Sequence, residues 1–293
     1  MACYFKDAGS NPGAHGLLRW GAHPRRVNWF AGGVNLARKI PPLRRGRIDG
    51  LMEDLARRPD TLLYLYSVYR EVVTATRFLR TAYERNGFAK PMRSIPFGVD
   101  VERDAKPKRS PGHRPVVGFI GQIARHKGAD ILIEAFKRLP KGAAELRIYG
   151  PGDQDPAFMA VLRAQADGAA IQFRGTFTKE KMREIMDSLD LLVIPSRWYE
   201  NSPLVLLNAL ATHTPVIVSD VAGMTEFLEE GRNGFSFRRG SVDSLERVLG
   251  SAVLDGGRLS EMPLTTTYDR TTRIMAEETM AIYTRESPTR TVT

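Results

Sequence analysis

The sequence predicts a doubly wound α/β domain over residues 116–262, and three observations support this. Short apolar strands alternate with amphipathic helices from Val116 onward. The strands are rich in Leu, Val and Ile without polar alternation, which is typical of a parallel sheet buried on both faces. Gly121, Gly150, Gly175 and Pro195 fall at strand carboxyl ends. Because ligands of such folds bind beyond those ends, we expect the functional site there.

The elements expected in this domain follow one another in alternation. Strands are expected over Val116–Gly121, Glu145–Gly150, Ile171–Gly175, Leu191–Pro195 and Val216–Ser219, and helices over Ala129–Leu139, Pro156–Asp167, Lys179–Ser188 and Pro203–Thr212. This alternation builds a parallel sheet with helices on both of its faces.

The chain before the main domain has a different character, and residues 1–100 are expected to form an incomplete N-terminal domain. Glu71–Thr74 and Arg93–Pro96 predict short strands, and Arg77–Asn86 predicts a helix ended by Gly87. Residues 1–50 show little periodicity, so no element is assigned to them.

Two further segments flank the main domain. Residues 101–115 are polar and rich in Lys and Pro, which predicts an interdomain linker. Residues 263–293 are expected to hold one helix, Arg270–Thr284, that packs back toward the N-terminal part, followed by a polar tail.

Composition is that of an ordinary globular protein, with 42% hydrophobic and 26% charged residues among 293. No apolar run reaches the roughly 18 residues of a membrane span, and Met1–Gly21 lacks the apolar core of a signal peptide. The single cysteine, Cys3, rules out an internal disulfide and a cysteine-based metal site, which favours the reducing cytoplasm. The five histidines show no metal-ligand spacing.

The net charge of +10 belongs to the first part of the chain. Residues 1–115 hold 22 Lys and Arg against 10 Asp and Glu, whereas residues 116–293 hold 21 against 23. A solvated basic face explains this excess, and so does attraction to an anionic membrane surface or to nucleic acid. Because Arg38–Arg47 lacks interleaved aromatic residues, we favour the inner face of a membrane over nucleic acid.

The segment from Pro195 to Asp220 is the most informative. It places Glu200 directly ahead of a helix start, with Ser202 as the expected N-cap and Pro203 at the first helical position. A helix N-terminus attracts anions, because its first N–H groups and its dipole present positive charge. Glu200 is therefore expected either beside a polar group attached to a bound anion or simply to complement the helix dipole.

Three further loops lie at the same predicted edge. Lys127, in the loop Gly121–Gly128, either supplies a point charge to a phosphate or lies on the surface of a plain turn. The glycines of Tyr149–Asp153 let the backbone pass close to a ligand or only form a turn. The loop Gly175–Phe177 either presents backbone groups to a base or buries its phenylalanine.

Asn208 interrupts an almost wholly apolar helix, so we expect it to be buried and hydrogen-bonded. Its partner is expected to be either the backbone or a ligand hydroxyl. The sequence shows no Ser/His/Asp or Cys/His set and no Walker-type loop.

Taken in chain order, the motifs are Gly-Gln-Ile-x-x-x-Lys-Gly, Tyr-Gly-x-Gly, Phe-x-Gly-Thr, Pro-Ser-x-x-x-Glu, Thr-Pro-Val-Ile and Asn-Gly-Phe. Together they resemble the donor-binding domain of the retaining glycosyltransferases of family four, which have the GT-B fold. Ser94–Asp100 is similar to the segment that crosses between the two domains of that family. The resemblance covers residues 70–250 and implies a Rossmann-like donor domain beside an incomplete N-terminal α/β domain.

The resemblance implies a role for each matching residue. Glu200 matches the first glutamate of the family's Glu-x7-Glu motif, which holds donor-sugar hydroxyls near the reacting carbon. Lys127 matches the lysine on the donor diphosphate. The other residues that the resemblance places around the donor are Gly121, Gln122, Gly150, Gly175, Thr176, Phe177, Asn201, Ser202, Pro203, Leu204, Val205 and Asn208.

Three features depart from the family pattern. Asn208 stands where a second glutamate usually binds the ribose, and Gln122 stands where an arginine usually partners the lysine. Both changes remove charge, so weaker donor binding is expected. Residues 1–100 are also short for the acceptor-side domain of the family, which suggests a fragment or a natural truncation.

The implied reaction is transfer of a sugar from a nucleotide sugar to a polysaccharide, glycolipid or lipid-linked glycan, with retention of configuration and without a metal or other cofactor. Lys127 and the helix end at Ser202 would stabilise the leaving diphosphate. The acceptor would attack from the same face, so no protein nucleophile is needed. The alternative is a nucleotide-sugar-binding module without activity of its own; a sugar-nucleotide epimerase of the same fold fits the Glu200 segment less well.

Overall fold

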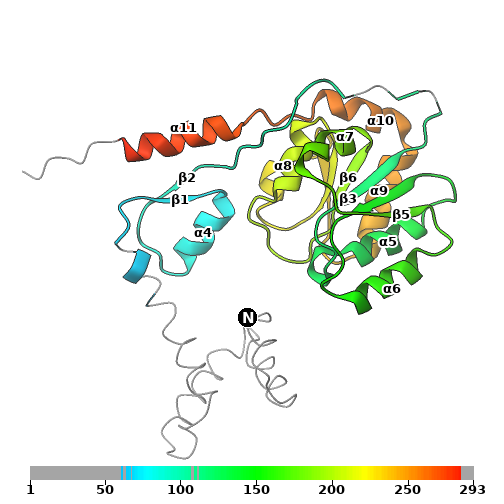
Figure 1. Ribbon diagram of the computed structural model, residues 1–293, viewed down its shortest axis with the longest axis horizontal. Coiled ribbons are helices and arrows are strands. Elements are labelled where there is room, and N and C mark those ends of the chain that lie inside the picture. The colour runs from blue at the N-terminus through cyan, green and yellow to red at the C-terminus, as the bar shows by residue number, and fades with distance from the viewer. Residues whose placement is uncertain (1–60, 62–63, 67, 107–108, 111, 285–293) are drawn as a thin grey trace, which may run out of the picture. The chain divides into compact units, whose positions relative to one another are not determined.

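The computed structural model describes residues 61, 64–66, 68–106, 109–110 and 112–284 (Figure 1). The chain divides into two units, Met1–Arg70 and Glu71–Thr293. The expectations for residues 1–50 and for the polar tail after residue 284 lie outside the described residues.

Six parallel strands form the main sheet of the second unit, in the order β5-β4-β3-β6-β7-β8. The strands are β3 Val116–Ile120, β4 Glu145–Tyr149, β5 Ile171–Gly175, β6 Leu191–Ile194, β7 Val216–Ser219 and β8 Gly234–Phe237. Successive strands run outward from β3 on one side and from β6 on the other. The order therefore reverses between β3 and β6, and a doubly wound sheet binds its ligand at this reversal.

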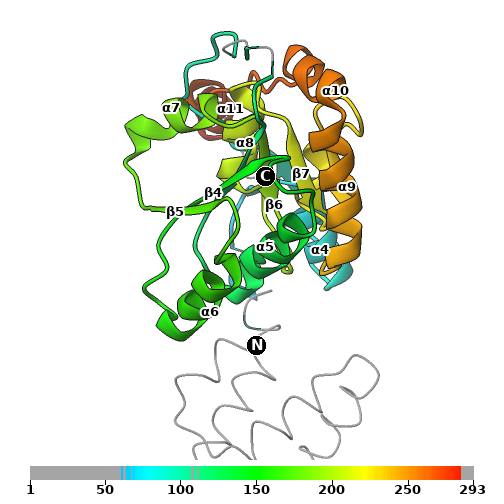
Figure 2. The same ribbon diagram turned by 90° about the vertical axis from the view of Figure 1, so that its right-hand side faces the viewer.

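Helices cover both faces of this sheet, which confirms the predicted fold class (Figures 1 and 2). One buried cluster joins the sheet to α5 Ala129–Lys137, α6 Pro156–Ala166 and α9 Val242–Leu254. A second joins its other face to α7 Met182–Asp187 and α8 Leu204–Ala211. The remaining short elements are η2 Arg125–Lys127, η3 Lys179–Lys181, η4 Thr225–Phe227, α10 Gly256–Glu261 and η5 Met262–Leu264.

The central strands are buried on both faces, as the lack of polar alternation predicts. Every residue of β3, β6 and β7 is buried. Burying one Leu, Val or Ile side chain contributes roughly 1.5–3 kcal/mol, so these strands fix the core. The edge strand β5 differs, because Gln172 and Arg174 are exposed along it.

Residues 71–100 form a small substructure within the second unit. Strands β1 Val72–Thr74 and β2 Met92–Ser94 pair in parallel, and α4 Arg77–Arg85 connects them. The helix begins where the Thr76 hydroxyl accepts the N–H of Leu79. It is followed by Gly87 at φ 88°, the left-handed conformation expected of a glycine after a helix.

The residues just before the last helix pack on residues 97–99, within the segment Ser94–Asp100. Helix α11 runs over Thr272–Tyr283, close to the expected Arg270–Thr284. The Arg270 carbonyl accepts the N–H of Val99 at 3.1 Å, and the Tyr268 hydroxyl donates to the Phe97 carbonyl at 2.5 Å. No helix in the described ranges has the length and apolar character needed to cross a bilayer.

Strand β8 and helix α9 were assigned no element from the sequence. A signal for α9 exists, because Leu245, Leu249 and Ala252 recur at helical spacing on its buried face. The Ser241 hydroxyl also accepts the N–H of Ser244 as an N-cap. Both features together would have located this helix.

Candidate functional site

Two of the predicted site residues meet at the carboxyl edge of the sheet. Lys127 follows β3 and Glu200 follows β6, the two strands between which the strand order reverses. The Lys127 Nζ donates to the Glu200 Oε1 at 2.6 Å, with side chains 29% and 13% exposed. The Ser196 hydroxyl donates to the same oxygen at 2.8 Å. An acid and an ammonium group thus converge where this fold places a ligand.

The two loops that carry this pair are tied together by Arg197. Its guanidinium forms two hydrogen bonds with Asp130, at 2.9 and 2.8 Å. Its backbone N–H donates to the His126 carbonyl at 2.7 Å, and its guanidinium also reaches the Arg125 carbonyl at 2.8 Å. Because a bidentate pair restricts both distance and orientation, Arg197 fixes the spacing of the two loops.

Two glycines allow the close approach of these loops. A Cβ on Gly128, at φ 75°, would lie 2.1 Å from the Pro195 carbonyl oxygen. A Cβ on Gly223, at φ 91°, would lie 1.7 Å from the carbonyl oxygen of Glu200. Both conformations are left-handed and both spaces are filled by backbone, so only glycine fits.

The start of α8 differs from the predicted cap. Pro203 is the N-cap, without a side-chain hydrogen bond, and the helix begins at Leu204. Ser202 was expected in the cap position, but its backbone turns at φ 56°, so its hydroxyl does not bond to the first turn. The Ser202 Oγ is buried and has no hydrogen-bond partner within the described part of the chain. The N–H groups of Leu204 and Val205, in the first turn, lack intrahelical partners by geometry.

Asn208 is partly exposed and not buried as expected. Its amide nitrogen donates to the Leu204 carbonyl one turn earlier, at 2.8 Å. The reason is its position on α8, where Leu207 and Ala209 on either side in sequence face the core and Asn208 does not. The backbone thus satisfies its amide group.

The other predicted residues of this loop lie in different surroundings. The Asn201 Oδ1 accepts a hydrogen bond from the Thr76 hydroxyl at 3.1 Å. Leu204 is 54% exposed, whereas Val205 is partly buried against the core cluster. Pro203 is partly buried.

The glycine loops after β3, β4 and β5 pack on one another. The Gly121 N–H donates to the Tyr149 carbonyl at 3.0 Å, and the Gly150 N–H donates to the Gly175 carbonyl at 2.8 Å. A Cβ on Gly150 would lie 1.9 Å from the Gly121 carbonyl oxygen. The side-chain amide of Gln122 donates a hydrogen bond to the side chain of Gln154.

The loop after β5 exposes its polar residue and shelters its aromatic one. Thr176 is exposed, and Gly175 adopts φ 69°. Phe177 is partly buried and meets Tyr149 edge to face, with ring centroids 5.8 Å apart. The expectation of a sheltered ring at Phe177 is therefore met in part.

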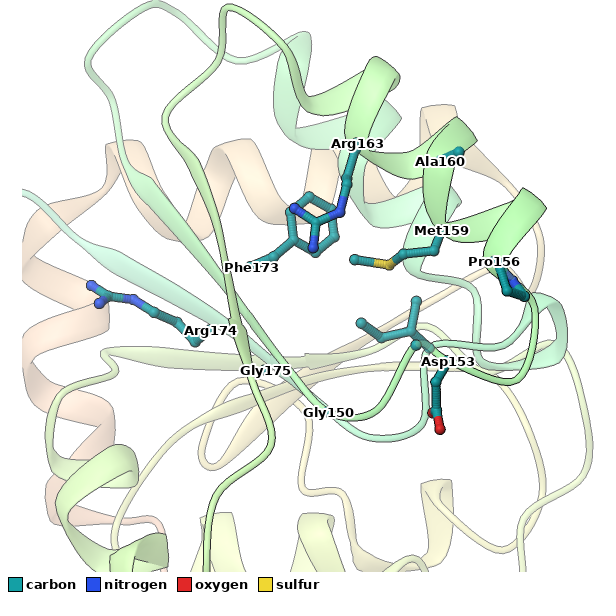
Figure 3. Close-up of a pocket in the computed structure, with 11 residues that line it drawn as sticks. Gly150, Asp153, Pro156, Met159, Ala160, Arg163, Phe173, Arg174 and Gly175 are labelled. Carbon is teal, nitrogen blue, oxygen red and sulfur yellow. The ribbon is translucent and has the colours of Figure 1, made fainter.

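A pocket of about 650 Å³ lies beside this loop (Figure 3). It is lined by Ile123, Gly150, Gly152, Asp153, Pro156, Met159, Ala160, Arg163, Phe173, Arg174 and Gly175. The Arg163 guanidinium lies over the Phe173 ring, 5.3 Å from its centroid. Two predicted donor residues, Gly150 and Gly175, line this pocket, whereas Lys127 and Glu200 do not.

The electrostatics of the pair extend to His126. Partial burial and the neighbouring Lys127 charge lower the pKa of His126, against the opposing effect of Glu200. The lowered pKa favours the neutral imidazole of His126, and Lys127 is paired with Glu200. Within the described ranges, no group of three or more His, Cys, Asp or Glu side chains could hold a metal ion.

Comparison with known proteins connects this domain to one family. Residues 114–255 match the family model of glycosyl transferases group 1. Granule-bound starch synthase 1 of Pisum sativum is 34% identical over 122 residues, covering 41% of this chain and 20% of that protein. Alpha-maltose-1-phosphate synthase of Mycolicibacterium smegmatis is 30% identical over 160 residues, covering 51% of this chain and 41% of that protein. The chain thus spans less than half the length of each relative.

Solved structures show the same fold. Anabaena HepE, in complex with UDP and glucose, superposes with a TM-score of 0.67 at 18% identity, over 77% of this chain and 66% of that one. Sucrose-phosphate synthase from Thermosynechococcus elongatus gives a TM-score of 0.64 at 20% identity, over 78% of this chain and 61% of that one. The second unit therefore has a GT-B, Rossmann-like fold, and residues 114–255 within it match the group 1 glycosyltransferases in sequence.

Proposed function

We propose that this chain transfers a sugar from a nucleotide-sugar donor to a glycan or lipid-linked acceptor, with retention of configuration, as a glycosyltransferase of family four. The contact between Lys127 and Glu200 at the β3–β6 reversal carries the proposal. It lies within the residues that match the group 1 glycosyltransferases. Relatives named as starch and maltose-1-phosphate synthases, and a neighbour bound to UDP, support a nucleotide-sugar donor.

The leaving diphosphate would sit between Lys127 and the start of α8. Its developing negative charge needs positive groups that are already in place, since such preorganised charge lowers the barrier. Lys127 supplies an ammonium group, and the N–H groups of Leu204 and Val205 supply the positive end of a helix. The buried Ser202 hydroxyl, without a partner in the described residues, fits an additional hydrogen bond to an oxygen there.

The sugar would be held by Glu200. Its carboxylate is oriented by Ser196 and Lys127, and it can accept hydrogen bonds from sugar hydroxyls. The acceptor hydroxyl would attack from the face that the diphosphate leaves, and would pass its proton to the leaving phosphate. The proposal thus needs neither a protein nucleophile nor a metal ion, because Lys127 and α8 provide the positive charge.

Other predicted contacts would be weaker than in the family pattern. Asn208 would offer its amide oxygen to the ribose without the charge of a glutamate, and Gln122 would add no cation to the diphosphate. Gly175, Thr176 and Phe177 would lie near the base. We therefore expect modest donor affinity.

The substitution Glu200→Ala tests the proposal. Sugar transfer, measured with a panel of radiolabelled nucleotide sugars and acceptors, should fall by at least about 100-fold, because the sugar loses its main anchor. Far-UV circular dichroism should show a folded protein, although loss of the partner of Lys127 lowers the thermal midpoint. Glu246→Ala, which removes a partly exposed partner of Arg138, is the control and should leave turnover unchanged. Unaltered turnover in Glu200→Ala would reject the proposal.

A second candidate is a nucleotide-sugar-binding module without activity of its own. It is favoured by the pocket beside β5, which Gly150 and Gly175 line but Lys127 and Glu200 do not. Calorimetric binding of a nucleotide sugar without transfer or donor hydrolysis would select this candidate. A thermal-shift screen of nucleotide sugars comes first, because a true ligand raises the apparent stability of the folded state.

The proposed location is the cytoplasmic face of a membrane, with no nucleic-acid partner. The basic excess of residues 1–115, 22 Lys and Arg against 10 Asp and Glu, supports attraction to anionic lipid. Cosedimentation with phosphatidylserine vesicles that is lost with phosphatidylcholine vesicles would support this location. Equal binding to both would contradict it.

A further inference from the structure

We propose that the first turn of α4 positions the Glu200 carboxylate, which makes Thr76 and Phe78 positioning residues for the proposed transfer. The inference rests on the proposed function, since it concerns the same site. Of three consecutive residues at the start of α4, Thr76 and Phe78 contact the neighbours of Glu200, and Arg77 contacts Glu226. The helix belongs to the same compact unit as the site but lies outside the residues matched by the family model.

The first contact joins the cap of α4 to the residue after Glu200. The Thr76 hydroxyl accepts the N–H of Leu79 at 3.1 Å and donates to the Asn201 Oδ1 at 3.1 Å. Thr76 is 2% exposed, so its hydroxyl is shielded from water, although Asn201 is exposed. One hydroxyl therefore fixes the helix start and the Glu200 loop together.

The second contact involves the residue before Glu200. The rings of Phe78 and Tyr199 stack, with centroids 5.4 Å apart and planes at 22°. The Arg239 guanidinium lies 5.4 Å from the centroid of the Tyr199 ring as well. Tyr199 is 53% exposed, so Phe78 and Arg239 are what restrict its ring.

The third contact anchors α4 to the domain independently of that loop. The Glu226 Oε2 accepts the N–H of Arg77 at 3.1 Å, in the first turn of α4. Its other oxygen, Oε1, is buried without a hydrogen-bond partner in the described part of the chain. A carboxylate at a helix N-terminus also complements the helix dipole, which strengthens the attachment.

These contacts hold Glu200 from both sides in sequence. Tyr199 and Asn201 are fixed by α4, while the Glu200 carboxylate is held by Lys127 and Ser196. The next residue, Ser202, has a left-handed backbone at φ 56°, which a non-glycine residue keeps only when its surroundings impose it. Without α4, the loop would relax and the carboxylate would shift. A displacement of about 1 Å can cost as much as 100-fold in rate.

The test compares Phe78→Ala and Thr76→Val with Tyr83→Ala. Tyr83→Ala is the matched control, because this ring lies on the same helix and packs on Phe88, 5.8 Å away. UDP-glucose and UDP serve as probes, or the donor found in the screen and its nucleoside diphosphate. We expect Phe78→Ala to lower kcat by at least about tenfold. UDP affinity should change less than about twofold, because Lys127 and α8 hold the diphosphate.

Thr76→Val should lower kcat in the same way, and Thr76→Ser, which keeps the hydroxyl, should restore it. Tyr83→Ala should lower the thermal midpoint without lowering kcat. A merely structural role for α4 would instead change the thermal midpoints of all three variants and leave kcat alone. That result would overturn the inference.

A second readout separates this inference from the proposed function. Amide hydrogen exchange over residues 198–203 should accelerate several-fold in Phe78→Ala and not in Tyr83→Ala, whether or not the chain is active. If the wild type neither binds nor uses any nucleotide sugar, the proposed function fails, and the exchange result still decides the role of α4. Unchanged exchange in Phe78→Ala overturns the role of α4, even in an active enzyme.

Discussion

The two ends of the main sheet each carry a lysine close to a carboxylate, but they use these charges differently. At the amino end, Asp190 precedes β6 and Lys106 lies between β2 and β3. At the carboxyl end, Glu200 follows β6 and Lys127 follows β3. The charges at the amino end stabilise the fold, whereas the charges at the carboxyl end can bind a ligand.

The cluster at the amino end uses both oxygens of its carboxylate in hydrogen bonds within the fold. Asp190 is buried and accepts from Arg109 at 2.6 Å, from His113 at 2.8 Å and from the N–H of Val116 at 2.7 Å. Lys106 donates to the Met186 carbonyl at 2.5 Å and to the Thr214 hydroxyl at 2.9 Å. These bonds attach residues 101–115 to the domain that holds the sheet, so this cluster is structural.

The cluster at the carboxyl end has fewer internal bonds. The Glu200 carboxylate accepts hydrogen bonds from Lys127 and Ser196, both at the same oxygen, Oε1. A carboxylate accepts about four hydrogen bonds, so Glu200 keeps capacity for others. A strong ion pair alone therefore does not identify a ligand site. An ion pair whose carboxylate can accept further hydrogen bonds, at the point where the strand order reverses, does identify one.

The largest expected effect comes from Asp190→Ala. Removing this buried carboxylate leaves Arg109 and the N–H of Val116 without their acceptor, so unfolding free energy should fall by about 3–5 kcal/mol in urea titration. Asp243→Ala is the control, because Asp243 also pairs with an arginine at 2.8 Å but is 78% exposed. It should cost less than about 1 kcal/mol. Equal losses of unfolding free energy in the two variants would show that the buried Asp190 contributes no more to stability than the exposed Asp243.

The next effect is the pH dependence that Lys106 introduces. Burial, with repulsion from Arg109, lowers the pKa of Lys106 from 10.5 to about 8. The unfolded chain therefore binds more protons than the folded one between pH 8 and 10.5, and stability rises with pH across that window. From about pH 7.5 to about pH 9.5 this amounts to about 2 kcal/mol.

The measurement is the difference between wild type and Lys106→Met in urea unfolding at both pH values. The variant lacks this titration, so the wild type should gain stability relative to it as the pH rises. A difference that stays constant across the window would show that Lys106 titrates normally.

The smallest expected effect concerns the affinity of the Lys127 and Glu200 cluster for UDP. In Glu200→Gln, Lys127 loses its charged partner and becomes free for a phosphate, so UDP should bind about tenfold more tightly, or about 1.4 kcal/mol. Sugar transfer should be lost at the same time. Glu145→Gln, which removes the partner of Arg147 on β4, is the matched control and should leave UDP binding unchanged in calorimetry. Weaker UDP binding in Glu200→Gln would show that Glu200 does not compete with phosphate for Lys127.

Much of the fold was predictable, because it depends on local apolar runs. Strands Ile171–Gly175 and Val216–Ser219 have the predicted bounds, and the other predicted elements of the domain differ by a few residues at their ends. Short strands buried on two faces have few alternatives to a parallel sheet with helices around it. The missed elements include β8, α9 and α10, which lie after the last predicted strand, where a short strand such as Gly234–Phe237 carries little signal.

Details of the site were less predictable. The N-cap position and the burial of Asn208 were predicted wrongly, because both depend on how the chain turns at Ser202 and on which face of α8 meets the core. The contact of Phe78 with Tyr199 had no sequence signal, since it joins residues more than a hundred positions apart.

The sequence alone was enough to predict a doubly wound sheet and the loops at its carboxyl edge. The reason is that the carboxyl ends of parallel strands all lie at the same edge of the sheet. Three features of the site could be seen only in the tertiary structure. Lys127 and Glu200 form an ion pair at 2.6 Å, Ser202 has a left-handed backbone, and the N-cap of α4 is hydrogen-bonded to the Glu200 loop. The physical reason is that burial follows local composition, whereas hydrogen bonds between distant loops require distances and angles that only the packed chain fixes.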